Sequence, residues 1–87
     1  MKNVWRLTSY DMKNQYYTCQ EFYSNQKAGK EAFWNLVNAK RLDLLIRDDE
    51  LPPLEETNGN ALQMILRNRH NICLTRHNLF SKAGKFN

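Results

Sequence analysis

The segment Val4-Trp5-Arg6-Leu7-Thr8-Ser9-Tyr10 alternates between two sets of side chains. In an extended chain Trp5 and Leu7 would point to one side and Arg6 and Thr8 to the other, which is typical of a strand with one buried face. A second segment with the same period, rich in aromatic residues, covers residues 16–23. Polar residues 11–15 separate the two segments by the length of a hairpin loop. We therefore expect an antiparallel β-hairpin.

An amphipathic helix is expected to follow the hairpin. Ser24 or Asn25 is a natural N-cap, because its side-chain oxygen can accept a hydrogen bond from the first helical turn. Apolar residues then recur at steps of three and four, on one helical face: Ala28, Ala32, Phe33, Leu36 and Val37. This face should cover Trp5 and Leu7 of the hairpin, with Trp34 beside it and partly exposed.

The second half of the chain predicts shorter elements. Residues 42–47 are an apolar run that favours a third strand. Residues 48–56 contain Pro52 and Pro53, which lack a backbone donor, so we expect an exposed acidic loop there and no central strand. Residues 61–69 are strong helix formers and favour a helix; the alternative is a strand with a hairpin turn at 68–71. Residues 72–80 are expected to form a strand, and residues 81–87 a frayed basic tail.

These elements predict one α+β domain spanning residues 1–87. It combines an N-terminal antiparallel β-hairpin, the following amphipathic helix, and a small antiparallel sheet with one or two helices on one face, in the order ββαβ(α)β. No apolar run approaches the roughly 18 residues that a membrane span needs, and the N-terminus has no leader-like apolar stretch. We expect a cytoplasmic protein without a membrane partner. Two cysteines, Cys19 and Cys73, are too few for a disulfide scaffold.

Charge is distributed unevenly along the chain. The net charge is +4, but residues 43–56 carry six acidic residues and one basic residue. Residues 57–87 carry five basic residues and no acidic one, and residues 1–42 carry seven basic and three acidic residues. An acidic segment thus separates two basic ones. Such a pattern bears on partners and association rates rather than on fold.

Several enzyme classes lack support in the sequence. With three glycines there is no phosphate-binding loop, no dinucleotide motif and no Gly-x-Ser-x-Gly elbow. His70, Cys73 and His77, with Cys19, are the only soft metal-ligand set, but the paired cysteines of structural zinc sites are missing. Arg69, His70, Arg76 and His77 could form a nuclease-like cluster, although no carboxylate nearby in sequence would orient either imidazole. We expect no cofactor, no metal and no catalytic residue.

Two binding hypotheses remain, and both make the protein non-enzymatic. In the favoured one, the stiff acidic loop enters a basic groove of a partner protein in the place of phosphates, through Asp48, Asp49, Glu50, Glu55 and Glu56. Exposed aromatic residues, Tyr23 and Trp34, would add to that interface. In the alternative, the basic C-terminal third binds DNA or RNA directly, through Arg67, Arg69, Arg76, Lys82 and Lys85. A homodimer, which would present both signs of charge to a second copy, is a further alternative.

The first half of the chain resembles small early proteins of bacteriophages. The resemblance rests on the opening strand Val4-Trp5-Arg6-Leu7-Thr8-Ser9-Tyr10, the aromatic second strand, and the helix segment Glu31-Ala32-Phe33-Trp34-Asn35-Leu36-Val37. In such proteins a hairpin is followed by one packed helix. The resemblance implies a protein that inhibits or redirects a host factor, such as a defence nuclease, by binding to it in the bacterial cytoplasm. It assigns a role to no individual residue.

Overall fold

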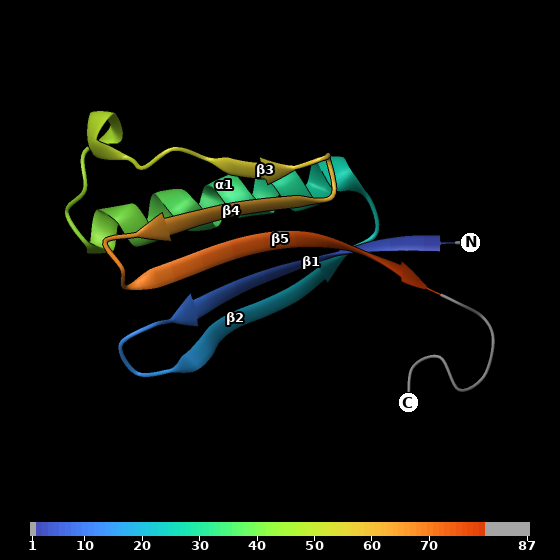
Figure 1. Ribbon diagram of the computed structural model, residues 1–87, viewed down its shortest axis with the longest axis horizontal. Helices are drawn as coiled ribbons and strands as arrows, with labels where there is room; N and C mark the ends of the chain where they lie inside the picture. The colour runs from blue at the N-terminus through green and yellow to red at the C-terminus, as the bar shows by residue number, and fades with distance from the viewer. Residues whose placement is uncertain (1, 80–87) are drawn as a thin grey trace.

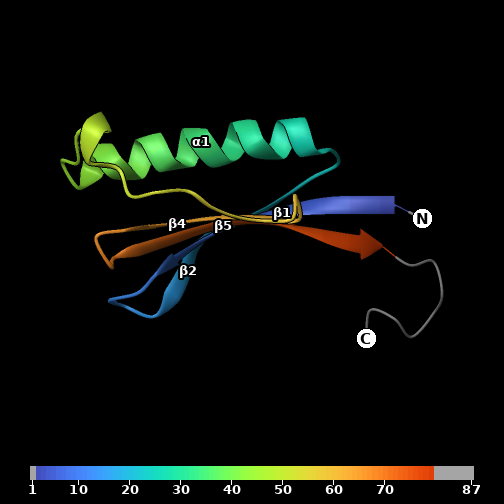
Figure 2. The same cartoon turned by 45° about the horizontal axis from the view of Figure 1, so that its top comes forward.

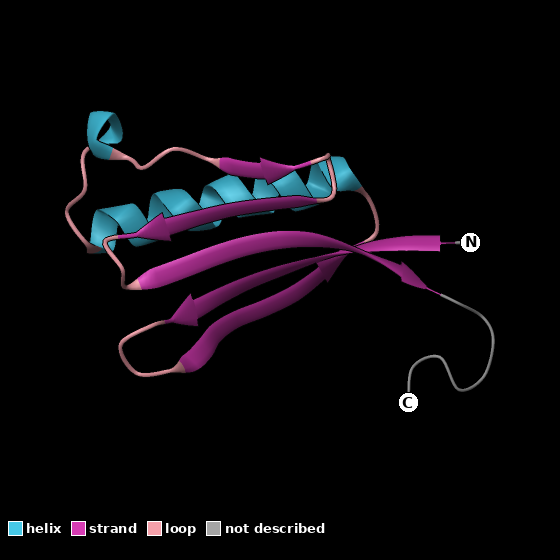
Figure 3. Ribbon diagram, viewed as in Figure 1, coloured by secondary structure: helices cyan, strands magenta, loops and turns pink. Residues whose placement is uncertain are grey.

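A five-stranded antiparallel sheet forms the body of the protein, and one long helix packs on one of its faces (Figures 1 and 2). The computed structural model describes residues 2–79. The elements in chain order are β1 (Lys2–Asp11), β2 (Tyr16–Tyr23), α1 (Gln26–Asp43), the 3-10 turn η1 (Asp48–Glu50), β3 (Glu55–Thr57), β4 (Ala61–Leu66) and β5 (His70–Leu79). In the sheet the strands lie in the order β2-β1-β5-β4-β3 (Figure 3).

The predicted hairpin is confirmed, and its first strand becomes central in the sheet. β1 pairs antiparallel with β2 on one side and with β5 on the other. Leu7 lies opposite Glu21 of β2 and opposite Leu74 of β5. Trp5 and Leu7 are buried on the face that α1 covers, as their alternation predicted.

The predicted helix is confirmed, including its start. The side chain of Asn25 accepts a hydrogen bond from the backbone N–H of Ala28 at 2.8 Å, so Asn25 is the N-cap. Glycine weakens a helix, and packing explains why one stands at position 29 of α1. A Cβ at this position would lie 3.1 Å from Cδ1 of Leu74 and 3.2 Å from Cβ of Trp5, so glycine lets the first turn of α1 approach the sheet closely.

The hydrophobic core lies between α1 and the sheet. The helix contributes Phe33 and Val37, both fully buried. Ile46, just after the helix, closes one end of the layer. The strands contribute the remaining buried apolar side chains: Trp5, Leu7, Leu62, Met64, Leu66, Ile72 and Leu74. The opposite face of the sheet carries no helix in the described residues (Figure 2).

The predicted strand over residues 42–47 is wrong. Leu42 and Asp43 complete the last turn of α1, and residues 44–47 form the turn that leaves it. The guanidinium of Arg41 donates from Nη1 to the carbonyl of Ile46 at 3.2 Å, which folds this segment back on the helix end. The apolar run arises because Leu44 and Ile46 pack inward around a helix terminus rather than along a strand.

The predicted helix over residues 61–69 is also wrong. The alternative of a strand and a hairpin turn is correct in kind, although the turn lies one to two residues earlier than the predicted 68–71. Residues 61–66 form β4, which pairs antiparallel with β5, and residues 67–69 form the turn. Leu62, Met64 and Leu66 are buried in alternation under α1. Pairing with β5 and burial of alternate side chains under α1 override the helix propensity of this segment.

The acidic segment is exposed, as predicted, but it is not one continuous loop. Asp48, Asp49 and Glu50 form η1, whereas Glu55 and Glu56 belong to the edge strand β3. The fold class is therefore confirmed as α+β, and residues 2–79 contain one α-helix rather than two. The predicted tail over residues 81–87 lies outside the described residues. Within residues 2–79, no helix is both long and apolar enough to cross a bilayer.

Candidate functional site

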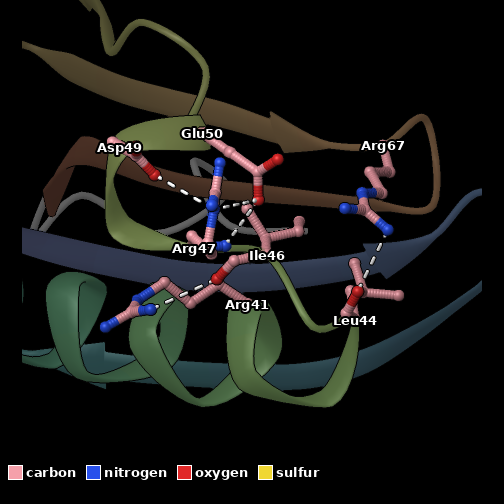
Figure 4. Close-up of polar contacts among 7 residues, drawn as sticks. All are labelled: Arg41, Leu44, Ile46, Arg47, Asp49, Glu50 and Arg67. Carbon is pink, nitrogen blue, oxygen red and sulfur yellow. Dashed lines mark hydrogen bonds and ion pairs between the residues drawn. The ribbon is translucent and has the colours of Figure 1, made fainter.

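The segment that leaves α1 forms a well-defined turn beside the acidic residues (Figures 1 and 4). The N–H of Ile46 donates to the carbonyl of Arg41 at 2.8 Å, and the N–H of Leu45 donates to the carbonyl of Leu42 at 3.2 Å. These two bonds are those of a Schellman motif, in which the residue at the position of Leu45 takes a left-handed conformation. Buried Ile46 supplies the apolar contact that accompanies such a motif.

Leu45 occupies the left-handed position with φ of 58°. Glycine is the usual residue there, since a Cβ is strained in this conformation. The Leu45 side chain is also 84% exposed, and that of Leu42, one turn earlier, is 63% exposed. We call Leu42, Leu45, Asp48, Asp49 and Glu50 the helix-end surface. It presents two leucines next to three carboxylates.

Three arginines hold the helix-end surface in place (Figure 4). Arg41 bonds the carbonyl of Ile46, and Arg67, from the β4–β5 turn, donates from Nη1 to the carbonyl of Leu44 at 3.1 Å. The backbone N–H of Arg47 donates to Oε1 of Glu50 at 2.9 Å. This region is thus preformed, which lowers the ordering cost of binding a partner.

The carboxylates of the helix-end surface are only weakly paired. Nε of Arg47 lies 3.4 Å from Oδ1 of Asp49 and 3.4 Å from Oε1 of Glu50, but all three side chains are solvent-exposed. Ion pairs so exposed are weak. The described residues include no ion pair to Asp48. Of the three arginines in this region only Arg47 is paired with the carboxylates, since Arg41 and Arg67 bond backbone carbonyls. The exposed carboxylates, Asp48 above all, are thus available to cations of a partner.

The aromatic candidates lie away from the helix-end surface. Tyr23 ends β2 near the start of α1, and its hydroxyl donates to Oε1 of Glu21 at 2.6 Å. This bond to a carboxylate raises the pKa of the Tyr23 phenol to about 12. Trp34 is 38% exposed at mid-helix and makes an edge-to-face contact with Phe33. Because α1 separates Tyr23 from the acidic turn by its length of about 27 Å, the structure does not unite these candidates.

The basic candidates do not form one patch either. Arg67 is bound to the carbonyl of Leu44, and Nε of Arg69 lies 3.5 Å from Oδ1 of buried Asp11. Arg76 is opposite Trp5 on β5, about 20 Å along the strand from the turn that holds the other two. Lys82 and Lys85 lie outside the described residues. The fold thus places two of these arginines at the same end of the molecule as the acidic turn.

The histidines and cysteines are divided between the two faces of the sheet. His70 is opposite Asp11 and buried on the helix side, whereas Cys73 and His77 lie on the uncovered face. Within residues 2–79, no three histidine, cysteine or acidic side chains group as metal ligands. The same division separates His70 from His77 in the nuclease-like cluster. Burial raises the pKa of the Cys73 thiol and, together with Glu21, that of Cys19.

Asp11 and His70 are buried and lie opposite one another on β1 and β5 at the hairpin end of the sheet, without a hydrogen bond between them. Backbone N–H groups of Asn14 and Lys13 donate to Oδ1 of Asp11, each at 3.0 Å, and these bonds lower the pKa of its carboxyl. Burial, and then the cation of Lys40, lower the pKa of the His70 imidazole. The fold therefore favours the charged carboxylate of Asp11 and the neutral imidazole of His70.

The sequence analysis missed an aromatic group on the uncovered face. Tyr10 and Tyr17 meet edge to face with ring centroids 5.0 Å apart, and the Arg6 guanidinium lies 5.8 Å from the Tyr17 centroid. Phe22, opposite Arg6, is 57% exposed. A strict period of two over residues 16–23 places Tyr17 and Phe22 on opposite faces, and the bulge in β2 brings them to the same face. No sequence pattern indicated that this face has no covering layer. For Leu42, the helical period beyond Val37 was a usable signal, because it places Leu44 inward and Leu42 outward.

Comparison with models of protein families, with curated proteins and with solved structures finds no match to this chain.

Proposed function

We propose that this chain is a small non-enzymatic binding protein that modulates a partner protein through the helix-end surface. The observation that carries the proposal is Leu45, which is 84% exposed in a conformation that glycine would adopt without strain. A strained and exposed leucine lowers the stability of the free protein. Strain of this kind concentrates at binding and switch sites.

The chemistry of the helix-end surface supports a basic partner. Leu42 and Leu45 would enter an apolar depression, and Asp48, Asp49 and Glu50 would meet cations around it. Complementary charge steers association and sets specificity, while apolar contacts supply most of the binding energy. Basic patches are the electrostatic footprint of proteins that handle nucleic acids. We therefore propose a host nucleic-acid-handling protein, such as a defence nuclease, as the partner, in keeping with the resemblance to early bacteriophage proteins.

The test compares capture of proteins from a nuclease-treated bacterial lysate by matched variants. Leu45→Gly removes the exposed leucine and relaxes the backbone, and Asp48→Asn with Asp49→Asn removes two charges. The control, Glu31→Gln with Glu56→Gln, removes the same number of charges outside the helix-end surface. We expect a specific captured protein whose band is lost with both site variants and retained with the control. Equal capture by all four proteins would contradict the proposal.

Direct nucleic-acid binding through the C-terminal third has less support. Arg67 and Arg69 are engaged with Leu44 and Asp11, and Arg76 lies well apart from them. Capture that disappears on nuclease treatment, with affinity that falls steeply with salt, would favour this alternative.

A further inference from the structure

β2 is an edge strand whose outer side is unusually open to pairing. It is the first strand of the sheet order, so β1 is its only neighbour within the described residues. It has eight residues and no proline, and Glu21 is its only charged residue. Tyr16, Tyr17 and Phe22 are 53%, 55% and 57% exposed. Unpaired edges of this kind are templates for another strand.

The opposite edge of the sheet is protected. β3 has three residues, two of which are Glu55 and Glu56, and prolines precede it. Short length, charge and proline are the usual ways in which proteins block edge pairing. The protein therefore blocks one edge and leaves the other available.

The aromatic residues of β2 are arranged symmetrically about Gln20. A bulge in β2, at the step between Ser9 and Tyr10 of β1, changes the side to which Tyr16 and Tyr17 point. Tyr16 and Tyr23 lie opposite Asp11 and Trp5, which share the helix side of β1. Tyr17 and Phe22 lie opposite Tyr10 and Arg6, which share the uncovered side. Counted along β1, Thr8 lies midway between Asp11 and Trp5, and also midway between Tyr10 and Arg6. Gln20, which is opposite Thr8, is therefore the midpoint of the two aromatic pairs of β2.

We propose that β2 pairs with β2 of a second copy, antiparallel, about a two-fold axis through Gln20. An isologous contact of this kind requires a self-complementary surface. About this axis Tyr17 of each copy meets Phe22 of the other on the uncovered face, and Tyr16 meets Tyr23 on the helix side. The dimer would have one continuous sheet of two joined halves, with four cross-strand aromatic pairs at the junction.

The charges on β2 allow this pairing. Glu21 would lie opposite Thr18 and Cys19 of the second copy, so the two Glu21 carboxylates do not face one another. Glu21 is also already bound by the hydroxyl of Tyr23. Gln20 is neutral and accepts a hydrogen bond from Nη2 of Arg6 at 2.6 Å, so no charge stands on the axis. This inference is independent of the helix-end surface, which lies near the other long edge of the sheet.

The test measures self-association of the full chain by sedimentation over a concentration series. The axis variant is Gln20→Glu, which keeps an acceptor for Arg6 in the monomer but places two carboxylates together in the dimer. The matched control is Gln26→Glu, an equal change at the start of α1. We expect a wild-type dimer, a Kd raised severalfold by Gln20→Glu at low salt, and no change with Gln26→Glu.

A charge exchange tests the register. Tyr17→Lys and Phe22→Glu should each raise the Kd about tenfold or more, since each removes two aromatic pairs. A one-to-one mixture of the two variants should recover dimerisation, because Lys and Glu then meet across the junction. Circular dichroism confirms that each variant is folded, and Gln20→Glu remains decisive if either is not. The proposal would be overturned by a wild-type protein that stays monomeric at the highest soluble concentration. It would equally be overturned by a dimer whose Kd is unchanged by these substitutions.

Discussion

At the residue scale, the most informative feature is the set of backbone positions with positive φ. They are Gln15, Leu45, Asn58, Arg67, Asn68 and Gly59. Asparagine and glycine tolerate this conformation, and Arg67 and Asn68 form the β4–β5 turn. Leu45 is the least suited of these residue types, and its side chain gains little burial. A residue that costs stability without contributing to the core indicates a role outside the fold.

Leu45→Gly is predicted to stabilise the protein by about 1 kcal/mol, because glycine adopts φ near 58° without strain. Urea denaturation at neutral pH measures this change as a higher midpoint with an unchanged slope. Leu42→Gly, inside the last turn of α1, should instead destabilise by about 1 kcal/mol. The interpretation of Leu45 would be wrong if its glycine variant were no more stable than the wild type.

His70 is predicted to make stability fall on acidification. Its pKa is lowered mainly by burial, with Lys40 and Arg69 adding to that effect and Asp11 and Asp43 opposing it. The unfolded chain therefore binds a proton more readily than the folded one. The contribution is complete above the ordinary histidine pKa of 6.5 and is lost as pH falls through the folded value. Asp11 acts in the same direction at lower pH, since its pKa is also lowered.

The measurement is the free energy of unfolding between about pH 7 and about pH 5. We expect a decline in the wild type and a flatter profile in His70→Asn. Identical slopes in the two proteins would contradict this account.

At the scale of elements, helix caps and strand pairing determine whether each segment forms a helix or a strand. β4 has both a period of two and strong helix formers, and β5 supplies the pairing that makes it a strand. For α1, local chemistry sufficed: Asn25 caps the first turn, and the Schellman turn after Leu44 ends the helix.

Asn25→Ala is predicted to destabilise the protein by about 1 kcal/mol, because the N–H of Ala28 loses its side-chain acceptor. Chemical denaturation gives the value, and Ser24→Ala serves as the neighbouring control with an expected change near zero. A loss with Ser24→Ala equal to that with Asn25→Ala would show that the cap has been assigned to the wrong residue.

At the scale of the whole molecule, one helix covers one face of a five-stranded sheet. A helix is about 10 Å across, whereas five strands spaced about 4.8 Å apart are wider, so β2 extends beyond the covered region. All large apolar burial therefore depends on a single interface between α1 and the sheet. The exposed rings of β2 and the uncovered face therefore remain available to partners, in addition to the helix-end surface.

Phe33→Ala is predicted to cost about 3–5 kcal/mol, because Phe33 is fully buried at the centre of this interface. Because the free energy of unfolding of a domain this small is itself only a few kcal/mol, we expect a large fraction of the variant to be unfolded at 37 °C. Circular dichroism measures this fraction. Trp34→Ala, at the adjacent exposed position, should cost much less. Similar losses for the two variants would place the core elsewhere.

The sequence by itself determined the hairpin, the start of α1 and the face of α1 that is buried, because alternation and capping act between residues close in the chain. It also determined that the segment with Pro52 and Pro53 could not be a central strand. Only the tertiary structure decided that residues 42–47 end a helix, that residues 61–66 form a strand, and that Leu45 and the rings of β2 stay exposed. Those outcomes depend on segments distant in sequence, such as Arg67 bonding Leu44 and β5 pairing with both β1 and β4. The exposed edge strand β2 follows from how far one helix reaches across the sheet, and the helix-end surface follows from the turn that ends this helix.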